Sequence, residues 1–204
     1  MTKVLCLEGI TGAGKTTQAR KISNFLNLGG YSHLIINEKQ YEPFRQRIID
    51  WHNSGANQNF TKEMIESIAK ARGETHKRHF THLLGILNYI IFDRSLYTSG
   101  VYESDGELTP EEIIKLNLKA GAIKLQSGII ILCSPEVARK RIDERRLKNN
   151  QYNLPSMHET IDEITKRREL YLELAKQHPE LYLIDSTDKT EDDIFNELRE
   201  KLKL

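Results

Sequence analysis

Cysteine is scarce in this 204-residue sequence, which contains only Cys6 and Cys133, each within an apolar run. Two such residues are too few for a zinc cluster and indicate a core role in a reducing compartment, so we expect a cytoplasmic protein. Long hydrophobic runs are absent as well. Without a stretch of ~18 apolar residues no helix is expected to span a membrane, and the apolar segment after Met1 is too short for a signal peptide.

An excess of charge of one sign is also lacking. Lys and Arg total 30 against 29 Asp and Glu, which leaves a net charge of +1. Tight, charge-driven binding to duplex nucleic acid is therefore not indicated. Hydrophobic residues at 38% and charged residues at 29% are ordinary for a folded globular protein, and the length is that of one domain. We expect residues 1–204 to form a single domain, with neither nucleic acid nor membrane as a partner.

Short apolar runs alternate with longer helical patterns along the chain. The runs are Val4–Leu7, Leu34–Ile36, Tyr89–Phe92, Ile129–Cys133 and Leu181–Ile184. Runs of this length, most of them rich in Ile, Leu or Val, are typical of parallel strands that helices cover on both faces. The sequence therefore predicts a three-layer α/β fold with a five-stranded parallel sheet and helices on both faces. In such sheets ligands bind beyond the carboxyl ends of the strands.

Helix boundaries are marked by cap residues. Thr109 precedes Pro110 and stands three residues before Glu112, which predicts a capped helix start. Ser134-Pro135 predicts the start of the next helix, and Thr190 can cap the last one. His178-Pro179 predicts the end of a long helix.

The segment after the first apolar run carries the most specific motif in the chain. It reads Gly9-Ile10-Thr11-Gly12-Ala13-Gly14-Lys15-Thr16, followed by Thr17, and matches G-x-x-x-x-G-K-[ST] between a strand and a helix. Glycines let backbone N–H groups converge on phosphate oxygens, and the start of the helix adds its positive end. Lys15 would reach the β- and γ-phosphates, and the Thr16 hydroxyl can hold Mg²⁺. The motif predicts a nucleoside triphosphate site.

Several motifs together resemble the thymidylate (dTMP) kinase family of P-loop nucleoside monophosphate kinases. The segment Leu7–Thr17 is close to the family's F-E-G-x-D-G-x-G-K-T-T, and Asp93–Glu103 falls without a gap on D-R-Y-x-x-S-S-x-A-Y-Q. The resemblance implies a P-loop NTPase fold with a lid segment near residues 142–160. It also implies ATP and Mg²⁺ as cofactors, a small-molecule nucleotide as the substrate, and the conversion of dTMP to dTDP. A homodimer would be in keeping with it.

The resemblance assigns roles to individual residues. Asp93 would hold the Mg²⁺ hydration shell or the acceptor, and Arg94 would clamp the acceptor phosphate in fork geometry. Arg141 and Arg145 share one helix face, from which a lid would bring them over the ATP phosphates. The catalytic candidates are Lys15, Asp93, Arg94, Arg141 and Arg145, and the metal candidates are Thr16 and Asp93.

The acceptor candidates come from several segments. Glu38 falls on the acid of the family's T-R-E-P and could bind the acceptor sugar or, in a nucleoside kinase, act as a base. Glu42 is a rival for this register, and either Arg45 or, preferably, Arg47 could reach the acceptor phosphate. Arg72 falls on a helix arginine that touches the acceptor base and phosphate in the family. The full acceptor set is Glu38, Arg47, Arg72, Arg94, Tyr102 and Glu103.

Departures from the family pattern keep alternatives open. Thr11 stands where the family usually has Asp, Ser95 replaces Tyr or His, Glu103 replaces Gln, and Ile68 replaces the aromatic residue that stacks on thymine. The segment Asp93–Thr98 also looks like the E-R-S-x-Y-S of deoxynucleoside kinases. The alternatives are therefore a deoxynucleoside kinase, another nucleoside monophosphate kinase, or a nucleotide-binding regulator that does not turn over.

Two further features predict structure rather than chemistry. His76, His79 and His82 recur every three residues, but on a helix this spacing drifts across faces, and no acid or Cys motif joins them. We therefore expect no metal site there. Trp51 is expected to be a packing residue.

Overall fold

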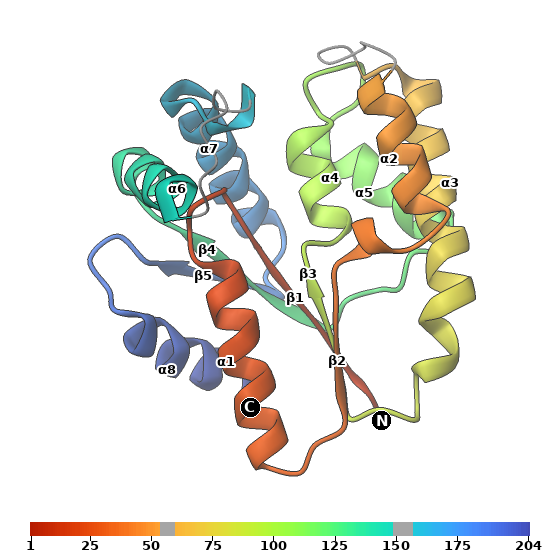
Figure 1. Cartoon of the computed structure of the whole chain (residues 1–204). Coiled ribbons are helices and arrows are strands. Elements are labelled where there is room, and N and C mark those ends of the chain that lie inside the picture. Colours follow the sequence, from red (N-terminus) through yellow and green to blue (C-terminus); the bar gives the residue numbers. More distant parts are fainter. Residues whose placement is uncertain (54–59, 149–156) are drawn as a thin grey trace. The chain divides into compact units, whose positions relative to one another are not determined.

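The computed structural model describes residues 1–53, 60–148 and 157–204 (Figure 1). Within these residues it contains a five-stranded sheet with the strand order β2-β3-β1-β4-β5. The strands are β1 (Lys3–Gly9), β2 (His33–Ile36), β3 (Tyr89–Asp93), β4 (Ser127–Leu132) and β5 (Leu181–Asp185). The α/β fold with a five-stranded parallel sheet, which the apolar runs predict, is confirmed.

Helices follow each strand, in the alternation that the sequence predicts. They are α1 (Lys15–Leu28), α2 (Phe44–Asn53), α3 (Lys62–His79), α4 (Leu96–Tyr102), α5 (Pro110–Lys119), α6 (Pro135–Lys148), α7 (Ile161–Gln177) and α8 (Glu191–Leu202). Short 3-10 helices are η1 (Glu38–Gln40), η2 (Thr81–Leu83) and η3 (Met157–Glu159).

The predicted helix caps are confirmed. Thr109 and Glu112 form a capping box at the start of α5, and Thr190 caps α8 in the same way. The Ser134 hydroxyl accepts a hydrogen bond from the Val137 backbone at the start of α6 (3.3 Å). These side chains satisfy backbone N–H groups that have no partner within the helix, which is why the helices begin at these residues.

The chain divides into two compact units. The first unit comprises residues 1–6 and 25–126, and the second comprises residues 7–24 and 127–204. The glycine-rich loop, the start of α1 and helices α6–α8 belong to the second unit, and helices α2–α5 belong to the first. Each unit has its own pair of parallel strands and its own buried side chains.

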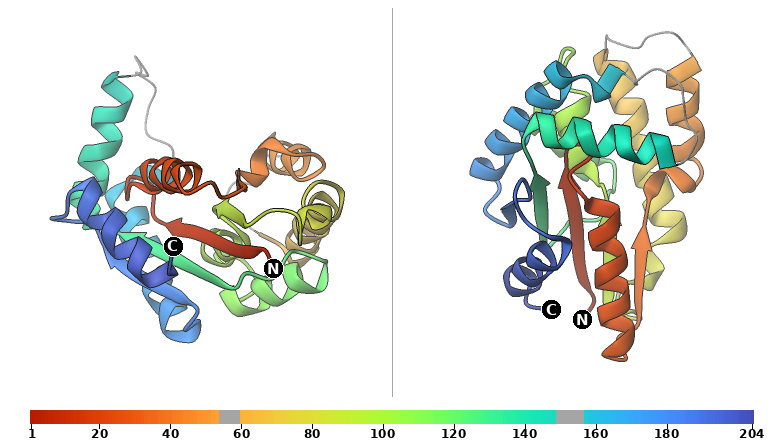
Figure 2. Two further views of the ribbon diagram at one scale, coloured as in Figure 1. Left: turned by 90° about the horizontal axis from the view of Figure 1, so that it is seen from below. Right: turned by 60° about the vertical axis from the view of Figure 1, so that its left-hand side comes forward.

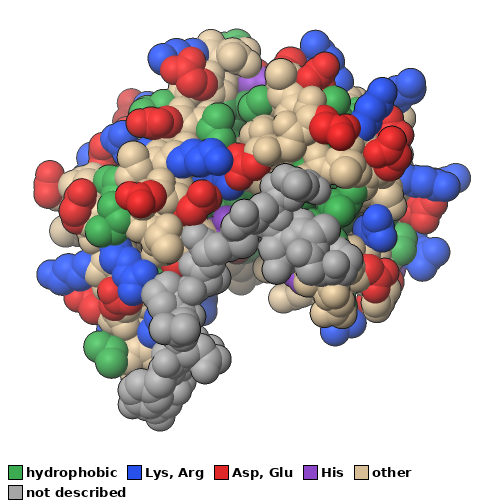
Figure 3. Space-filling model, turned by 90° about the horizontal axis from the view of Figure 1, so that it is seen from above, with side chains coloured by type: hydrophobic (Ala, Val, Ile, Leu, Met, Phe, Trp, Pro, Cys, Tyr) green, Lys and Arg blue, Asp and Glu red, His purple; other side chains and the backbone are tan. Residues whose placement is uncertain are grey.

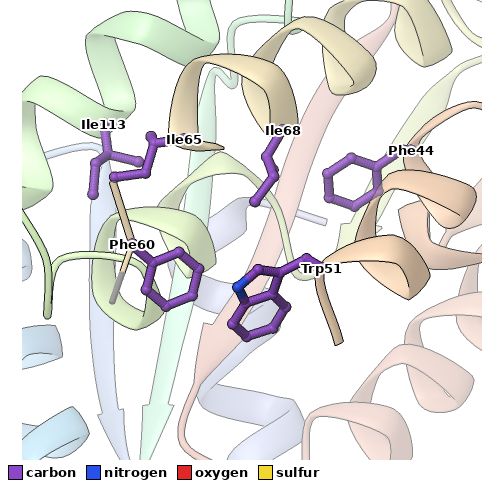
Figure 4. Packing of buried hydrophobic residues seen from close by; sticks show 6 residues of the cluster. All are labelled: Phe44, Trp51, Phe60, Ile65, Ile68 and Ile113. Atoms are coloured by element: carbon purple, nitrogen blue, oxygen red, sulfur yellow. The ribbon is translucent and has the colours of Figure 1, made fainter. Parts of the chain in front are cut away.

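In the first unit, β2 pairs with β3 in parallel register, from His33 opposite Tyr89 to Ile36 opposite Phe92. Helix α3 packs against α2 and α5, and α5 also packs against α4. A hydrophobic cluster joins α2, α3 and α5 and consists of Phe44, Trp51, Phe60, Ile65, Ile68 and Ile113 (Figure 4). Trp51 stacks on Phe60 with ring centroids 4.7 Å apart, so it is the packing residue that the sequence predicts.

In the second unit, β4 pairs with β5 in parallel register, from Gly128 opposite Leu181 to Leu132 opposite Asp185. Helices α7 and α8 both pack on these strands, and Figure 2 shows them on opposite sides. The central residues of β4 are therefore fully buried, which accounts for its unbroken run of isoleucines. The strand ends at Leu132, one residue earlier than predicted, and the fully buried Cys133 lies in the turn to α6.

The surface carries charges of both signs. Lys and Arg side chains are interspersed with Asp and Glu side chains over the face drawn in Figure 3. Such mixing is what a net charge of +1 leads one to expect, and it produces no strong field of one sign on that face. Among the described residues, no helix is both long enough and apolar enough to cross a membrane.

Candidate active site

The glycine-rich loop leaves β1 at Gly9 and enters α1 at Lys15. Gly9 has a φ of +129°, and a Cβ atom there would lie 1.9 Å from the Ile131 carbonyl oxygen, so only glycine fits. The Lys15 ammonium donates hydrogen bonds to the carbonyls of Gly9 (3.0 Å) and Ile10 (2.7 Å). The loop thus holds a cation at the start of a helix, where the helix dipole adds positive potential. This arrangement suits a phosphate chain.

Two threonines lie in the first turn of α1. Thr16 is exposed, and its hydroxyl has no hydrogen-bond partner within the described part of the chain. Thr17 is half-buried in the same turn. The Thr16 hydroxyl is therefore available as an oxygen ligand for Mg²⁺. The rest of the predicted loop lies between β1 and α1 and comprises Ile10, Thr11, Gly12, Ala13 and Gly14.

Arg141 on α6 is connected to the loop through Ser186. Its guanidinium donates hydrogen bonds to the Ser186 hydroxyl (3.3 Å) and carbonyl (2.9 Å). The Ser186 hydroxyl in turn donates to the Ala13 carbonyl (3.2 Å). Ser186 follows β5 and is fully buried. One buried residue therefore links Arg141 to the loop, a role for Ser186 that its place after the last strand did not reveal.

Arg145 has a different environment, although it lies one turn further along α6. It pairs with Glu159 of η3, its guanidinium Nη2 lying 3.6 Å from Oε1, and Arg146 pairs with the same carboxylate. Of the segment predicted as a lid, residues 149–156 lie outside the described residues. The lid therefore stays a prediction, and Arg141 is the arginine of this helix that the structure joins to the loop.

The first unit contains a buried polar network around Arg72. Its Nε donates to Glu38 Oε2 (3.1 Å), and its Nη1 donates to Asn117 Oδ1. His76 Nε2 is hydrogen-bonded to the other carboxylate oxygen, Glu38 Oε1. All four side chains are buried. The Arg72 guanidinium also lies over the Phe44 ring, 4.5 Å from its centroid. Both oxygens of Glu38 are therefore engaged within the protein.

Close packing of α3 and α5 makes this network possible. Gly73 follows Arg72, and a Cβ atom there would lie 1.8 Å from the Ala120 carbonyl oxygen. A larger residue would keep the two helices apart. Asn117 is oriented by its own amide, which donates to the Ile113 carbonyl (2.8 Å) and leaves Oδ1 for Arg72. The sequence did not reveal this contact, because Arg72 and Asn117 lie 45 positions apart.

The hydrogen bonds of His76 define the tautomer of its neutral ring. The Ile123 backbone N–H donates to His76 Nδ1 (2.8 Å), so Nδ1 is an acceptor. The proton of the neutral ring then lies on Nε2, where it is donated to Glu38. His79, the next histidine of the series, is hydrogen-bonded through Nε2 to the Glu42 carbonyl. The partners of both rings are protein groups.

The charge state of Glu38 follows from these contacts. Burial alone would raise the pKa of Glu38, but the Arg72 charge and the His76 hydrogen bond outweigh burial and lower that pKa below its ordinary value. An ionised carboxylate with both oxygens engaged is a poor general base. The geometry therefore favours Glu38 as the residue that positions Arg72.

The rival acid Glu42 has a structural role at the start of α2. Its Oε2 accepts a hydrogen bond from the Gln46 backbone (3.0 Å), and its Oε1 accepts one from Arg45 (3.3 Å). Arg47 differs from Arg45, because its Nε is buried and has no hydrogen-bond partner among the residues described. Of the two arginines, Arg47 is thus the one available to an anion.

The carboxyl end of β3 carries Asp93 and Arg94. The Asp93 carboxylate makes no hydrogen bond or ion pair with any described residue, so it is available to a ligand. Arg94 has a φ of +73°, which is rare for a residue with a side chain and frequent at functional sites. Its guanidinium lies 5.6 Å from the centroid of the Tyr102 ring, at the end of α4. Ser95 caps α4, accepting a hydrogen bond from the Tyr97 backbone.

Glu103 directly follows α4 and is only 7% exposed. The Ser99 hydroxyl donates to Glu103 Oε1 (2.5 Å). Burial raises the pKa of Glu103, against the attraction of Arg72 and Lys39. The pKa of Lys39 is lowered, first by partial removal of its ammonium group from water and then by the charge of Arg94. Lys39 therefore belongs to this cluster, although its only signal in the sequence was its place after the second strand.

Ile68 is part of the hydrophobic cluster and is fully buried. It lies with Phe44 and Trp51 in Figure 4. Ile68 stands where the family carries a stacking aromatic residue, and here this position packs in the core. The aromatic ring that contacts Arg72 is that of Phe44.

Comparison with known proteins identifies the family of this chain. The family model described as thymidylate kinase matches residues 7–197. A probable thymidylate kinase of Methanosphaera stadtmanae is 28% identical over 98% of this chain and 99% of its own length. A probable thymidylate kinase of Thermococcus onnurineus is 29% identical over 95% and 94%, and a thymidylate kinase of Leptospira borgpetersenii is 26% identical over 80% and 77%. The chain therefore belongs to the thymidylate kinase family and is a nucleotide kinase.

Proposed function

We propose that this kinase transfers the γ-phosphoryl group of ATP to dTMP and releases ADP and dTDP. The observation that carries the acceptor assignment is the set of cations in the first unit. These cations are Lys39 of η1, Arg47 of α2, Arg72 of α3 and Arg94 directly after β3. The buried acid Glu38 is paired with Arg72. The relatives described above carry the name thymidylate kinase, which agrees with a dTMP acceptor.

A monophosphate acceptor suits this set of charges. It brings about two negative charges at neutral pH, which only several cations can neutralise. Arg94 would bind its phosphate in fork geometry, and Arg47 would add a second guanidinium. An oxygen of this phosphate would then attack the γ-phosphorus of ATP, and the bond from that phosphorus to the β,γ-bridging oxygen would break. The protein contributes mainly by positioning the two nucleotides and neutralising charge.

The donor would lie on the glycine-rich loop of the second unit. Lys15 would contact the β- and γ-phosphates, and Arg141 would add a charge from α6. Thr16 in this unit offers an oxygen ligand for Mg²⁺, and Asp93 in the first unit offers another, since neither side chain is engaged with a described residue. Bound there, Mg²⁺ would neutralise phosphate charge.

A deoxynucleoside kinase, the main alternative, would need a base for the 5′-hydroxyl. Glu38 was the candidate, but its two oxygens bind Arg72 and His76. Ser95, the residue shared with that family, has a local role as the cap of α4. Both features favour the monophosphate acceptor.

The decisive experiment measures kcat/KM with ATP for dTMP, dUMP, dCMP, dGMP and thymidine. We expect the largest value for dTMP. A Lys15→Ala preparation purified in parallel controls for contaminating kinases. A higher kcat/KM for thymidine than for every monophosphate would overturn the proposal. EDTA should abolish turnover and excess Mg²⁺ restore it, and light scattering would test the homodimer that the family resemblance suggests.

A further inference from the structure

The Arg72 guanidinium has one nitrogen that the described part of the chain does not engage. Its Nε donates to Glu38 Oε2 (3.1 Å), and its Nη1 donates to Asn117 Oδ1. Its Nη2 makes no hydrogen bond with any described residue. A guanidinium is a donor at every nitrogen and an acceptor at none, so Nη2 has both of its N–H groups to offer. A charged donor left open in a side chain that is only 2% exposed is suited to an anionic ligand.

The carboxylate that holds Nε of Arg72 could also take Nη2. The Nε–H bond and one N–H bond of Nη2 are parallel in a guanidinium, and together they match the two oxygens of a carboxylate. Glu38 already binds Nε through Oε2. Because a buried carboxylate oxygen must find a donor, Oε1 would bind Nη2 if no other group supplied one. Both oxygens of Glu38 would then be paired with Arg72, and Nη2 would be lost to a ligand.

His76 supplies the other donor. Its Nε2 is hydrogen-bonded to Glu38 Oε1, and its Nδ1 accepts the backbone N–H of Ile123 (2.8 Å). Since Nδ1 is an acceptor, the proton of the neutral ring lies on Nε2 and is donated to Oε1. The two oxygens of Glu38 are thus divided between Arg72 and His76.

Packing holds the His76 ring in this orientation. The ring stacks on Phe92 of β3, with centroids 5.1 Å apart and an interplanar angle of 21°. The Phe80 ring meets it edge-on, with its centroid 5.5 Å away. His76 and Glu38 are both buried, so bulk water does not compete for Oε1. The donor to this oxygen is therefore a fixed part of the fold.

We propose that His76 is a positioning residue, which keeps Glu38 Oε1 from binding Arg72 and so reserves Arg72 Nη2 for an oxygen of the monophosphate acceptor. This inference rests on the proposed function, in which the acceptor binds among the cations of the first unit. His76 acts through Glu38 and needs no contact with the substrate. Its effect should therefore appear in the affinity for the acceptor and leave the affinity for ATP unchanged.

Replacing His76 by phenylalanine tests this role. His76→Phe keeps an aromatic ring against Phe92 and Phe80 and removes the Nε2–H donor. Glu38 Oε1 should then take Nη2, and the KM for dTMP should rise by roughly ten- to a hundredfold, because a charged hydrogen bond is lost. The values of kcat and of the KM for ATP should change little. His76→Gln, whose amide NH₂ group can donate to Oε1 in place of Nε2, should restore most of the affinity for dTMP.

A double-mutant cycle with Glu38→Gln separates positioning from packing. Glutamine has one acceptor oxygen where glutamate has two, so it cannot bind Nε and Nη2 of Arg72 as a fork. In this background His76→Phe should change the KM for dTMP little, whereas a packing role would raise that KM equally in both backgrounds. His79→Phe is the matched control: the His79 ring is bonded to the Glu42 carbonyl, and its loss should leave the KM for dTMP at the wild-type value.

Nitrogen NMR of the wild-type protein keeps the inference testable if His76→Phe does not fold. The nitrogen chemical shifts of the His76 ring should show a proton on Nε2 and none on Nδ1, and a proton on Nδ1 would overturn the inference. An unchanged KM for dTMP in folded His76→Phe, or equal increases in both Glu38 backgrounds, would overturn it as well. Each of these outcomes leaves the proposed function intact. The absence of dTMP turnover in the wild-type protein would overturn the proposed function, and the inference with it.

Discussion

Lys15 is the residue whose change should affect chemistry most and structure least. Its ammonium donates hydrogen bonds to the loop carbonyls of Gly9 and Ile10. We expect Lys15→Ala to lower kcat by ~10²-fold or more, because a charge that stabilises the transition state is lost. The far-UV circular dichroism spectrum should not change.

The control for this prediction lies on the same helix. Lys21 pairs with Asp192 at the surface, so Lys21→Ala should leave turnover close to wild type. Near-wild-type turnover in a folded Lys15→Ala protein would show that the loop is not the donor site.

Replacing Arg94 by lysine tests whether the fork geometry of the guanidinium matters in addition to its charge. Arg94→Lys keeps the charge and also keeps a Cβ atom, so the left-handed backbone at φ +73° is equally strained in both proteins. A lysine cannot form two parallel hydrogen bonds with a phosphate. We expect kcat/KM for dTMP to fall by about ten- to a hundredfold, with the KM for ATP unchanged.

Arg45→Lys is the matched control, since Arg45 is exposed and paired with Glu42. Equal losses of ATP and dTMP binding in Arg94→Lys would place Arg94 in a structural or donor-side role instead.

Glu103 should make the folded state sensitive to pH. Its folded-state pKa is raised above the ordinary 4.5 by burial, so the native protein binds the proton more tightly than the unfolded chain. The neutral carboxyl group therefore makes its full contribution to the free energy of unfolding below pH 4.5. This contribution is lost as the pH rises through the folded-state pKa. At pH 7 we expect Glu103→Met to be more stable than wild type by about 1–3 kcal/mol, because a buried oxygen without a hydrogen-bond partner among the described residues is removed.

Urea unfolding at several pH values would measure this difference. The difference in the free energy of unfolding between Glu103→Met and wild type should shrink as the pH falls toward 4.5. There the wild-type carboxyl becomes neutral in both the folded and the unfolded state. A difference that grows on acidification would contradict the assignment.

At the scale of elements, the contact between α3 and α5 decides whether Arg72 reaches Asn117. Gly73 is the close-approach position, with a Cβ atom 1.8 Å from the Ala120 carbonyl. Helix propensity alone would make Gly73→Ala stabilising by about 1 kcal/mol. We expect destabilisation by about 1–3 kcal/mol, because the helices must separate, together with a higher KM for dTMP.

Chemical denaturation and acceptor kinetics would check this prediction. Lys70→Ala, at an exposed position of the same helix, should change stability by no more than about 0.5 kcal/mol. A Gly73→Ala protein that is more stable than wild type would show that the helices tolerate the methyl group.

At the scale of the whole molecule, the proposed donor and acceptor groups fall in different compact units. The loop, Lys15 and Arg141 belong to the second unit, and the network around Arg72 belongs to the first. Hydrogen exchange should therefore respond to the two ligands separately. We expect ADP alone to slow exchange in residues 9–17, and dTMP alone to slow it in η1, α3 and α4, since bound ligands suppress local opening.

Lys15→Ala provides the control, because it should remove the response to ADP and leave the response to dTMP. Protection of both regions by either nucleotide alone would mean that the two units do not respond independently.

Much of the fold was determined by the sequence alone, because the signals are local. Apolar runs of three to five residues located each strand that the structure describes. Caps such as Thr109 and Thr190 located helix starts, since each satisfies backbone groups within one turn. The glycine-rich loop was equally readable, because its chemistry lies in one continuous segment. The ends of the strands were predicted less accurately than their positions. The predicted run ends at Leu7, whereas β1 extends over Glu8, which is buried and accepts a hydrogen bond from the distant residue Tyr171.

Only the tertiary structure decided which charges are available. Glu38 looked like a substrate acid in the sequence, but α3 brings Arg72 and His76 to its two oxygens. His76 looked unremarkable because its partners lie 38 and 47 positions away. Glu103 looked like a simple departure from a glutamine, whereas burial next to Ser99 leaves one oxygen without a described partner. Hydrogen bonding and desolvation depend on neighbours from distant segments, so no local pattern encodes them.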